Sequence, residues 1–297
     1  VLKTAIDLGL NHIDTSNVYG MGTSEERIGS FLKKQGKQAN NLFSIATKAA
    51  IYRDPNTGSR GFDNSFIHLE DELDKSLERM NLDCVDLFYV HRRDPNIPIE
   101  EVTESLAKLV KKGKILNIGY SEISPSSLIR ATSIHQVAAV QSEYSLSTRS
   151  PEMGLLETCK NLGTALVAFS PVGRTLLTDS PLSYRFAQTL DFTKNNPRFM
   201  QPNYDANILI TDKFRIYARD HGVSASTLAI AWILAKGEHI IPIPGTRSSD
   251  HLRELAAAMD FDMTSQILGD IETILPMGWA HGDRYSEAQW IGPERYC

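Results

Sequence analysis

Residues suited to proton chemistry end three successive short apolar segments of the sequence. They are Asp14 after "NHI", Lys48 after "FSIAT" and His91 after "CVDLFYV". A fourth, Tyr19, follows Asp14 closely and lies beside two glycines. A carboxylate, an ammonium, an imidazole and a phenol are groups that give protons to, or take them from, a reacting atom. Each alone has an ordinary explanation, as a cap, a solvated charge, a rim histidine or a turn aromatic. Their conjunction favours a catalytic site.

The elements that must position these residues form a regular alternation. Short β-branched runs predict seven strands, at 11–14, 43–48, 84–91, 115–121, 137–143, 165–170 and 240–245. Stretches with helical periodicity predict helices at 24–35, 65–80, 99–112, 124–133, 152–162 and 248–258, with a longer helical region at 206–236 interrupted near Gly222. Ser124 before Pro125 and Ser226 are expected to begin helices. This alternation is typical of a parallel sheet with crossover helices.

Two architectures fit that alternation, the doubly wound open sheet and the (β/α)8 TIM barrel. The chain opens with helical spacing in "VLKTAIDLGL", and such a helix needs a strand before it to complete a βα unit. We therefore expect an α/β fold of the (β/α)8 class with its first strand missing from this chain. No linker divides the sequence, so we expect one domain over 1–297. In a barrel, the carboxyl ends of the strands meet at one mouth, which would gather Asp14, Lys48 and His91.

Composition excludes several classes of function. A net charge of −5 argues against a nucleic-acid partner, since such proteins carry basic patches. The longest strongly apolar run, 228–235, is too short to span a membrane. Cys84, Cys159 and Cys297 lie far apart and suggest neither a disulfide framework nor a metal pair, which fits a cytoplasmic protein. The scattered histidines predict no metal site. "GMGTSE" lacks the third glycine of a dinucleotide fingerprint.

At these residues the sequence resembles the aldo-keto reductase superfamily. The segments "HIDTSNVYG", "IATK" and "YVHR" are similar to the family's signatures for its catalytic Asp, Tyr, Lys and His. The resemblance continues over essentially the whole chain, through "NIGYSEIS", "AVQSEYSL", "AFSPVGRTLLT", "NNPRF" and "IPGTRSSDHLRE". It implies that Asp14, Tyr19, Lys48 and His91 are catalytic, and that a strand precedes the first helix.

The implied activity is reduction of an aldehyde or ketone to an alcohol, or the reverse, by direct hydride transfer from NADPH. Tyr19 would protonate the carbonyl oxygen. A phenol, with an ordinary pKa of about 10, is a poor acid near neutral pH unless its anion is stabilised. Lys48 would supply the stabilising cation, and Asp14 would hold that ammonium in place. His91 would hydrogen-bond the substrate oxygen.

The resemblance also implies cofactor contacts. Ser121 and Gln141 would hold the nicotinamide carboxamide, and Phe169 would stack on its ring. Arg247, at a helix start after the last strand, favours NADPH over NADH, although NADH stays possible. Glu122 and Leu255 stand where many relatives have Asn. The full set of expected cofactor residues is Ser121, Glu122, Gln141, Phe169, Ser170, Pro171, Val172, Gly173, Arg174, Arg198, Gly245, Thr246, Arg247, His251 and Glu254.

The substrate is expected to be a small carbonyl compound or alcohol, bound by Tyr52, Arg92, Arg93 and Trp279. Residues 171–205 form a long irregular stretch that we expect to cover a site, and residues 276–297 form an aromatic tail. Two other functions stay open at this point: a nucleotide-binding subunit that senses redox state with little turnover, and a Schiff-base lyase that uses Lys48. The sequence leaves the choice between monomer and homo-oligomer undetermined.

Overall fold

The structure is a computed structural model, which describes residues 1–36, 42–53, 58–295 and 297. Its residues divide into two compact units. The first, here the N-terminal unit, comprises Leu2–Ser142, Gly154–Leu166 and Gly292–Cys297. The second, here the C-terminal unit, comprises Glu143–Met153 and Val167–Ile291 together with Val1. The interpretation of the chain as one domain stays a prediction.

The N-terminal unit is built on parallel strands. Strand β1 (His12–Asp14) pairs with β2 (Ser44–Ala49), β2 with β5 (Val85–Val90), β5 with β6 (Ile115–Ser121), and β6 with β7 (Val137–Glu143). The register sets Asp14 opposite Ala46, Lys48 opposite Tyr89 and Ser121 opposite Gln141. Since the strands are parallel, their carboxyl ends lie at one edge of the sheet.

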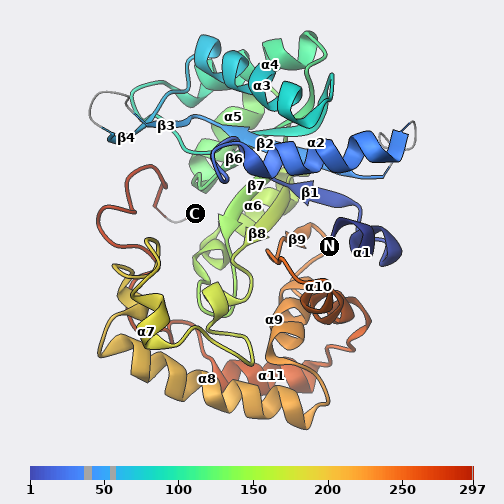
Figure 1. The fold of residues 1–297 in the computed structure, drawn as a ribbon. Coiled ribbons are helices and arrows are strands. Elements are labelled where there is room, and N and C mark those ends of the chain that lie inside the picture. Colours follow the sequence, from blue (N-terminus) through green and yellow to red (C-terminus); the bar gives the residue numbers. More distant parts are fainter. Residues whose placement is uncertain (37–41, 54–57, 296) are drawn as a thin grey trace. The chain divides into compact units, whose positions relative to one another are not determined.

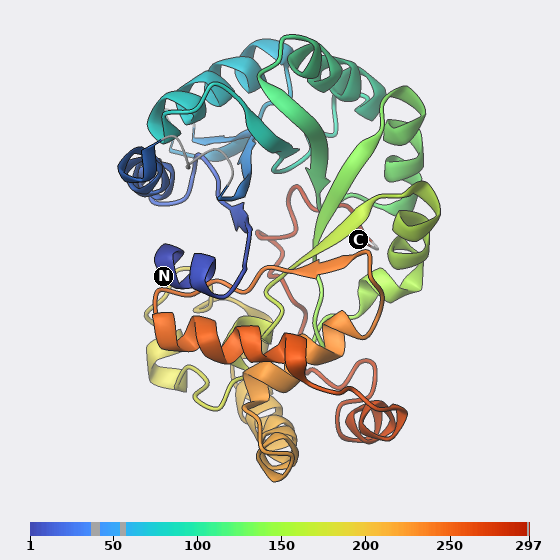
Figure 2. The same ribbon diagram turned by 90° about the vertical axis from the view of Figure 1, so that its right-hand side faces the viewer.

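Helices alternate with these strands, as the sequence predicts. They are α1 (Leu2–Asp7), α2 (Thr23–Gln35), α3 (Phe66–Met80), α4 (Ile99–Lys111), α5 (Pro125–Ile134) and α6 (Leu155–Leu162) (Figure 1). In Figure 2, the blue-green and green helices of this unit run along the outer side of its strands. A short antiparallel hairpin, β3 (Ile51–Arg53) with β4 (Arg60–Phe62), follows β2.

Helix α3 shows why these segments are helical. Ser65 caps it, because its side chain accepts a hydrogen bond from the backbone N–H of His68. The buried face of α3 repeats at helical spacing through Leu69, Leu73 and Leu77. Helix α5 begins in the same way, with Ser124 as the cap and Pro125 in the first turn, which confirms that expectation.

The C-terminal unit holds the end of β8 (Ala165–Phe169) and the short β9 (Ile240–Pro242), joined by a hydrogen bond from the Ile243 N–H to the Ala168 carbonyl. Its main helices are α8 (Asn203–Asp220), α9 (Ala225–Leu234), α10 (Ser249–Ala256) and α11 (Ser265–Ile274). The expectation that Ser226 caps a helix is wrong. The cap is Ser224, which accepts from Thr227, and Ser226 is buried inside α9.

The expected irregular stretch 171–205 contains three short helical segments before α8 begins. They are η3 (Gly173–Thr175), α7 (Tyr184–Ala187) and η4 (Pro197–Phe199). The stretch has its own apolar cluster, in which Leu176, Ala187 and Phe199 pack with Tyr204. Its expected role as a cover stays a prediction.

All seven predicted strands are present in one sheet, in the order β1-β2-β5-β6-β7-β8-β9. This parallel arrangement with crossover helices confirms the predicted α/β class of the (β/α)8 type. The predictions missed the hairpin β3–β4 and helix α11. Among the described residues, the longest helices are too short or too polar to cross a bilayer.

Candidate active site

The centre of the site is a buried ion pair. Lys48, at the end of β2, has a side chain with 0% exposure, and its ammonium contacts the Asp14 carboxylate at the end of β1. The ammonium also donates to the backbone carbonyl of Thr15, at 2.7 Å. The second oxygen of Asp14 accepts from the side-chain amide of Gln141, at 2.8 Å. Each charge is therefore met by an opposite charge and a further hydrogen bond, as a buried ion pair requires.

Tyr19 lies beside this ion pair. The Lys48 Nζ is 5.1 Å from the centroid of the Tyr19 ring. The ring also meets the His91 imidazole edge-on, with centroids 5.9 Å apart. Tyr19 is 41% exposed, whereas Lys48 is fully buried. The phenol is thus the member of this group that a molecule in solution can reach.

The glycines beside Tyr19 allow the tight turn that presents it. Gly20 and Gly22 have φ values of +60° and +91°, which residues with a side chain rarely adopt. A Cβ on Gly22 would lie 2.8 Å from Cδ of Arg79 on α3. The turn is also held at Tyr19 itself, whose backbone N–H donates to the Ser16 carbonyl at 3.1 Å.

His91 follows β5 and completes the group. Its Nδ1 lies 3.1 Å from Oγ of Ser16. Burial holds the pKa of His91 well below its ordinary value, and the positive charges of Arg92 and Lys48 lower it further. The imidazole is therefore neutral near pH 7 and carries one N–H.

Ser121, at the end of β6, is linked to the same edge by Arg92. The guanidinium Nη1 of Arg92 donates to Oγ of Ser121 at 2.9 Å and to the carbonyl of His91 at 2.6 Å. Gln141 lies opposite Ser121 in the register, and its amide is held by Asp14. The structure therefore brings seven predicted residues together on the N-terminal unit: Asp14, Tyr19, Lys48, His91, Arg92, Ser121 and Gln141.

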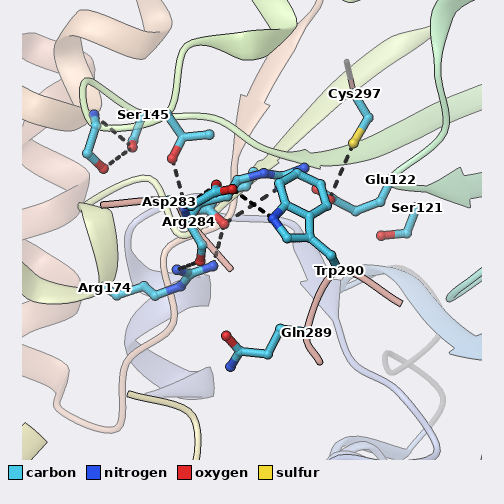
Figure 3. Close-up of polar contacts among 12 residues, drawn as sticks. Ser121, Glu122, Ser145, Arg174, Asp283, Arg284, Gln289, Trp290 and Cys297 are labelled. Carbon is cyan, nitrogen blue, oxygen red and sulfur yellow. Dashed lines mark hydrogen bonds and ion pairs between the residues drawn. The ribbon is translucent and has the colours of Figure 1, made fainter. Parts of the chain in front are cut away.

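Glu122 contacts the end of the chain. It is fully buried at φ +59°, and its backbone carbonyl accepts from the N–H of Glu294 at 2.8 Å. The thiol of Cys297 lies 3.4 Å from Oε2 of Glu122 (Figure 3). The Glu294 carboxylate in turn accepts from the N–H and the hydroxyl of Ser124, each at 2.8 Å. Glu294 and Cys297 thus hold the turn after β6 in place through hydrogen bonds.

The two other pocket residues expected on this unit differ in accessibility. Tyr52, on β3, is 40% exposed and its ring meets the His68 ring with centroids 6.0 Å apart. Arg93 is buried, and its Nε is 3.5 Å from Oε1 of Glu294. Tyr52 is therefore open to a ligand, whereas Arg93 faces the tail.

In the C-terminal unit, two expected cofactor arginines gather around one carboxylate. Arg174 pairs with Glu143 and donates to the Arg284 carbonyl at 2.6 Å (Figure 3). Arg198 donates to the Thr148 hydroxyl at 2.7 Å, and its Nη1 is 3.8 Å from Glu143. Burial, opposed by Glu143, lowers the pKa of Arg198 to about 10. Arg174 and Arg284 add repulsion. This unit thus concentrates positive charge near β8.

The loop after β9 leads into α10 as predicted. Arg247 is exposed, and the following residue, Ser248, caps α10 by accepting from the N–H of His251 at 3.3 Å. The hydroxyl of Thr246 accepts from the Ser248 N–H at 3.1 Å. An exposed guanidinium one residue before a helix N-terminus suits a phosphate.

The remaining expected residues of this unit are placed as follows. Phe169 ends β8, and its carbonyl accepts from the Tyr144 N–H at 3.3 Å. Ser170, at φ +51°, begins the turn through Pro171 and Val172 to Gly173. Gly245 is exposed, and the Glu254 carbonyl accepts from Thr227. Trp279, expected in the substrate pocket, is buried and donates its indole N–H to the Leu146 carbonyl at 2.8 Å.

Two residues of the site were not singled out from the sequence. Thr15 and Ser16 contact Lys48 and His91, yet they lie in the same short segment as Asp14 and Tyr19. Their position between Asp14 and Tyr19 in the sequence is the feature from which they could have been predicted. Over the described ranges, no three His, Cys, Asp or Glu side chains group as metal ligands would.

Comparison with known proteins defines the class. The aldo/keto reductase family matches residues 1–276 of the chain. The chain therefore belongs to the aldo/keto reductase family, a family of oxidoreductases.

Individual relatives cover nearly the whole chain. The aldo-keto reductase yakc of Schizosaccharomyces pombe, whose name includes NADP(+), is 35% identical over 288 residues, which are 96% of this chain and 84% of that protein. The aldo-keto reductase str7 of Strobilurus tenacellus is 37% identical over 96% of this chain and 82% of its own length. The solved structure of the glycerol dehydrogenase AKR11B4 from Gluconobacter oxydans matches with a TM-score of 0.81 at 26% identity, over 92% of this chain and 83% of that one. The fold is thus the TIM-barrel-like arrangement of aldo-keto reductase structures.

Proposed function

We propose that this chain is an NADP(H)-dependent carbonyl reductase that reduces an aldehyde or ketone to an alcohol, or catalyses the reverse oxidation. The observation that carries the proposal is the buried ammonium of Lys48, paired with Asp14 and 5.1 Å from the centroid of the Tyr19 ring. A cation in that place would balance the negative charge that Tyr19 acquires when it gives its proton to a substrate.

In this proposal, each of the four catalytic residues has its own role in proton transfer. Tyr19 donates its proton to the substrate oxygen, and the charge that it acquires is balanced by Lys48. Asp14 holds the ammonium in position. His91, neutral and buried, donates a hydrogen bond that orients the carbonyl. The nicotinamide, when bound, supplies the hydride to the carbonyl carbon.

Several observations support NADP(H) as the cofactor. The name of the Schizosaccharomyces pombe relative specifies NADP(+). In this chain, Arg247 is exposed at the start of α10, where backbone N–H groups also favour an anion. Ser121 lies at the same strand edge as the catalytic group, and its hydroxyl accepts a hydrogen bond from Arg92. We assign the adenosine phosphate to Arg247 and the carboxamide to Ser121 and Gln141. The further contacts that we assign are Glu122, residues 169–174, Arg198, Gly245, Thr246, His251 and Glu254.

The substrate contacts belong to the same proposal. Tyr52 and Arg92 are the expected pocket residues with accessible side chains on the N-terminal unit. Arg93 and Trp279 are buried, whereas Tyr52 is exposed and Arg92 is partly exposed, so we assign substrate contact to Tyr52 and Arg92 first. The cytoplasmic location stays a prediction, and no oligomeric state is proposed.

Substitution of Tyr19 by Phe tests the reaction. We expect Tyr19→Phe to lower kcat by about 10²- to 10⁴-fold, because the general acid is removed. Nucleotide affinity should change little. The measurement is NADPH oxidation with a panel of aldehydes and ketones, and Tyr184→Phe, on a half-exposed tyrosine of α7, is the matched control. Undiminished turnover in Tyr19→Phe would remove Tyr19 as the proton donor.

The same assay separates the two rival functions. A redox-sensing subunit would retain NADPH without consuming it. A Schiff-base lyase would become labelled at Lys48 when borohydride is added with substrate. The pairing of Lys48 with Asp14 opposes that role, because a protonated amine is not a nucleophile.

Substitution of Arg247 by Ala tests the choice of cofactor. We expect Arg247→Ala to weaken NADPH binding by about 10-fold or more, since a hydrogen bond to a charged group is lost. NADH binding should change far less. Dissociation constants from fluorescence titration would measure both. Equal losses for the two nucleotides would show that Arg247 does not contact the adenosine phosphate.

A further inference from the structure

Ser16 is placed to act on the imidazole of His91. It lies between Asp14 and Tyr19 in the loop after β1, and its side chain is fully buried. Its Oγ is 3.1 Å from Nδ1 of His91, although the two residues are 75 positions apart in the chain. The loop fixes Ser16 through its backbone carbonyl, which accepts from the N–H of Tyr19 at 3.1 Å. The contact is therefore part of the same turn that presents the phenol.

The hydroxyl of Ser16 has one proton and three acceptors within reach. Oγ of Ser16 is 3.3 Å from Oδ1 of Asn17, 3.4 Å from the carbonyl of Lys48 and 3.1 Å from Nδ1 of His91. The imidazole nitrogen is the nearest of the three. The Asn17 side chain is fixed by its amide nitrogen, which donates to Glu72 at 2.7 Å.

The position of the ring proton matters because His91 is neutral. Burial and the charges of Arg92 and Lys48 keep its pKa well below the ordinary value, so the ring carries one N–H, on either Nδ1 or Nε2. Because the Ser16 hydroxyl lies against Nδ1 of His91, Nε2 is the ring nitrogen left to contact a substrate oxygen. Only a proton on Nε2 lets His91 donate to a carbonyl, because a carbonyl oxygen is an acceptor.

We propose that the Ser16 hydroxyl donates to Nδ1 of His91 and thereby holds the ring proton on Nε2, which makes Ser16 a positioning residue for carbonyl reduction. This inference rests on the proposed function for its catalytic consequence. Its structural content, the tautomer of one histidine, can be measured without cofactor or substrate. A hydrogen bond from a hydroxyl stabilises the tautomer whose Nδ1 is an acceptor.

The decisive measurement is the tautomer of His91 in the free protein. Long-range ¹H–¹⁵N NMR distinguishes a protonated from an unprotonated ring nitrogen, and His91→Asn identifies the His91 signals among those of the eight histidines. We expect wild type to show an unprotonated Nδ1 and a protonated Nε2 at pH 7. A proton on Nδ1 of the wild-type ring would overturn the inference, whatever the enzyme's activity.

Three variants then test the causal role of Ser16. Ser16→Ala should shift the ring toward a mixture of tautomers and lower kcat by about 5- to 10-fold, the loss expected for one hydrogen bond, with little change in KM. Ser16→Thr keeps the hydroxyl and should restore both the tautomer and kcat. In the His91→Asn background, Ser16→Ala should have no further effect on kcat, because the two residues act as one unit.

The outcomes separate this inference from the proposed function. A chain that shows the Nε2 proton but reduces no carbonyl contradicts the proposed function alone. A chain that reduces carbonyls while Ser16→Ala keeps wild-type tautomer and kcat contradicts this inference alone. If Ser16→Ala does not fold, the wild-type spectrum and Ser16→Thr still decide.

Discussion

The two units differ in how many cations surround a buried carboxylate. In the N-terminal unit, the single ammonium of Lys48 meets the single carboxylate of Asp14, and hydrogen bonds from Gln141 and to Thr15 complete the pair. In the C-terminal unit, three guanidinium groups share one buried carboxylate, Glu143: those of Arg174, Arg198 and Arg284. The first arrangement is electrically balanced within the chain. In the second, three guanidinium groups repel one another around that carboxylate, and Asp283 is a further negative charge that acts on Arg198.

The two arrangements differ in what holds them. The Lys48–Asp14 pair is satisfied by groups of the N-terminal unit alone. In the arginine cluster, the pKa of Arg198 is lowered chiefly by burial, and repulsion from Arg174 and Arg284 adds to that effect. An anion that bound near the three guanidinium groups would relieve their mutual repulsion.

The largest effect is expected when the balanced pair is broken. Lys48→Met should remove activity and lower the free energy of unfolding by about 3–5 kcal/mol, because the Asp14 carboxylate stays buried without its cation. Urea unfolding measures the loss. Lys75→Met, which breaks an exposed pair with Asp71 on α3, should cost less than about 1 kcal/mol. Similar losses in the two variants would contradict a special role for the buried pair.

A smaller and reversible effect is expected in the arginine cluster. Glu143→Gln should lower the free energy of unfolding by about 2 kcal/mol, since an amide still accepts hydrogen bonds but no longer offsets the guanidinium charges. Sulfate should restore the loss, whereas chloride at equal ionic strength should not. Asp212→Asn, on an exposed pair with Arg215, is the control. If sulfate restores the free energy of unfolding of Lys48→Met to the same extent, the two units do not differ in how their buried charges are balanced.

The smallest effect concerns pH and belongs to the N-terminal unit. His12 and His91 both have a pKa lowered chiefly by burial. Below about pH 6.5, a histidine becomes protonated in the unfolded chain but stays neutral in the folded protein. The free energy of unfolding therefore falls as the pH falls below about 6.5 and is nearly constant above it. At pH 5.5 the loss from His91 should be about 1 kcal/mol, and that from His12 less. Thermal unfolding of His91→Gln between pH 5 and 8 should show a shallower acid slope than wild type, and an unchanged slope would argue against a neutral His91.

Much of this fold could be predicted because hydrophobic periodicity is a local property. The strand ends at Asp14, Lys48 and His91 follow from runs of apolar residues, and parallel pairing brings such ends together. Helix α11 was readable in the same way, since Thr264 caps it and Ile271 and Leu275 recur on its buried side, but no element was predicted there. The strands of hairpin β3–β4 are too short to show alternation.

The orientation of side chains could not be predicted. The order "VSAST" offers several capping residues, and the packing of α9 selects Ser224 over Ser226. Nothing local distinguishes Arg92, which holds Ser121, from Arg93, which faces Glu294. The role of Ser16 depends on a histidine far along the chain, and such contacts exist only once the sheet has formed.

The contrast in exposure between the phenol and its supporting ammonium has a kinetic consequence. Tyr19 is 41% exposed, whereas Lys48 is fully enclosed. If Tyr19 is the proton donor, as we propose, water can return a proton to its phenolate directly after each turnover. The proton then needs no relay through buried groups.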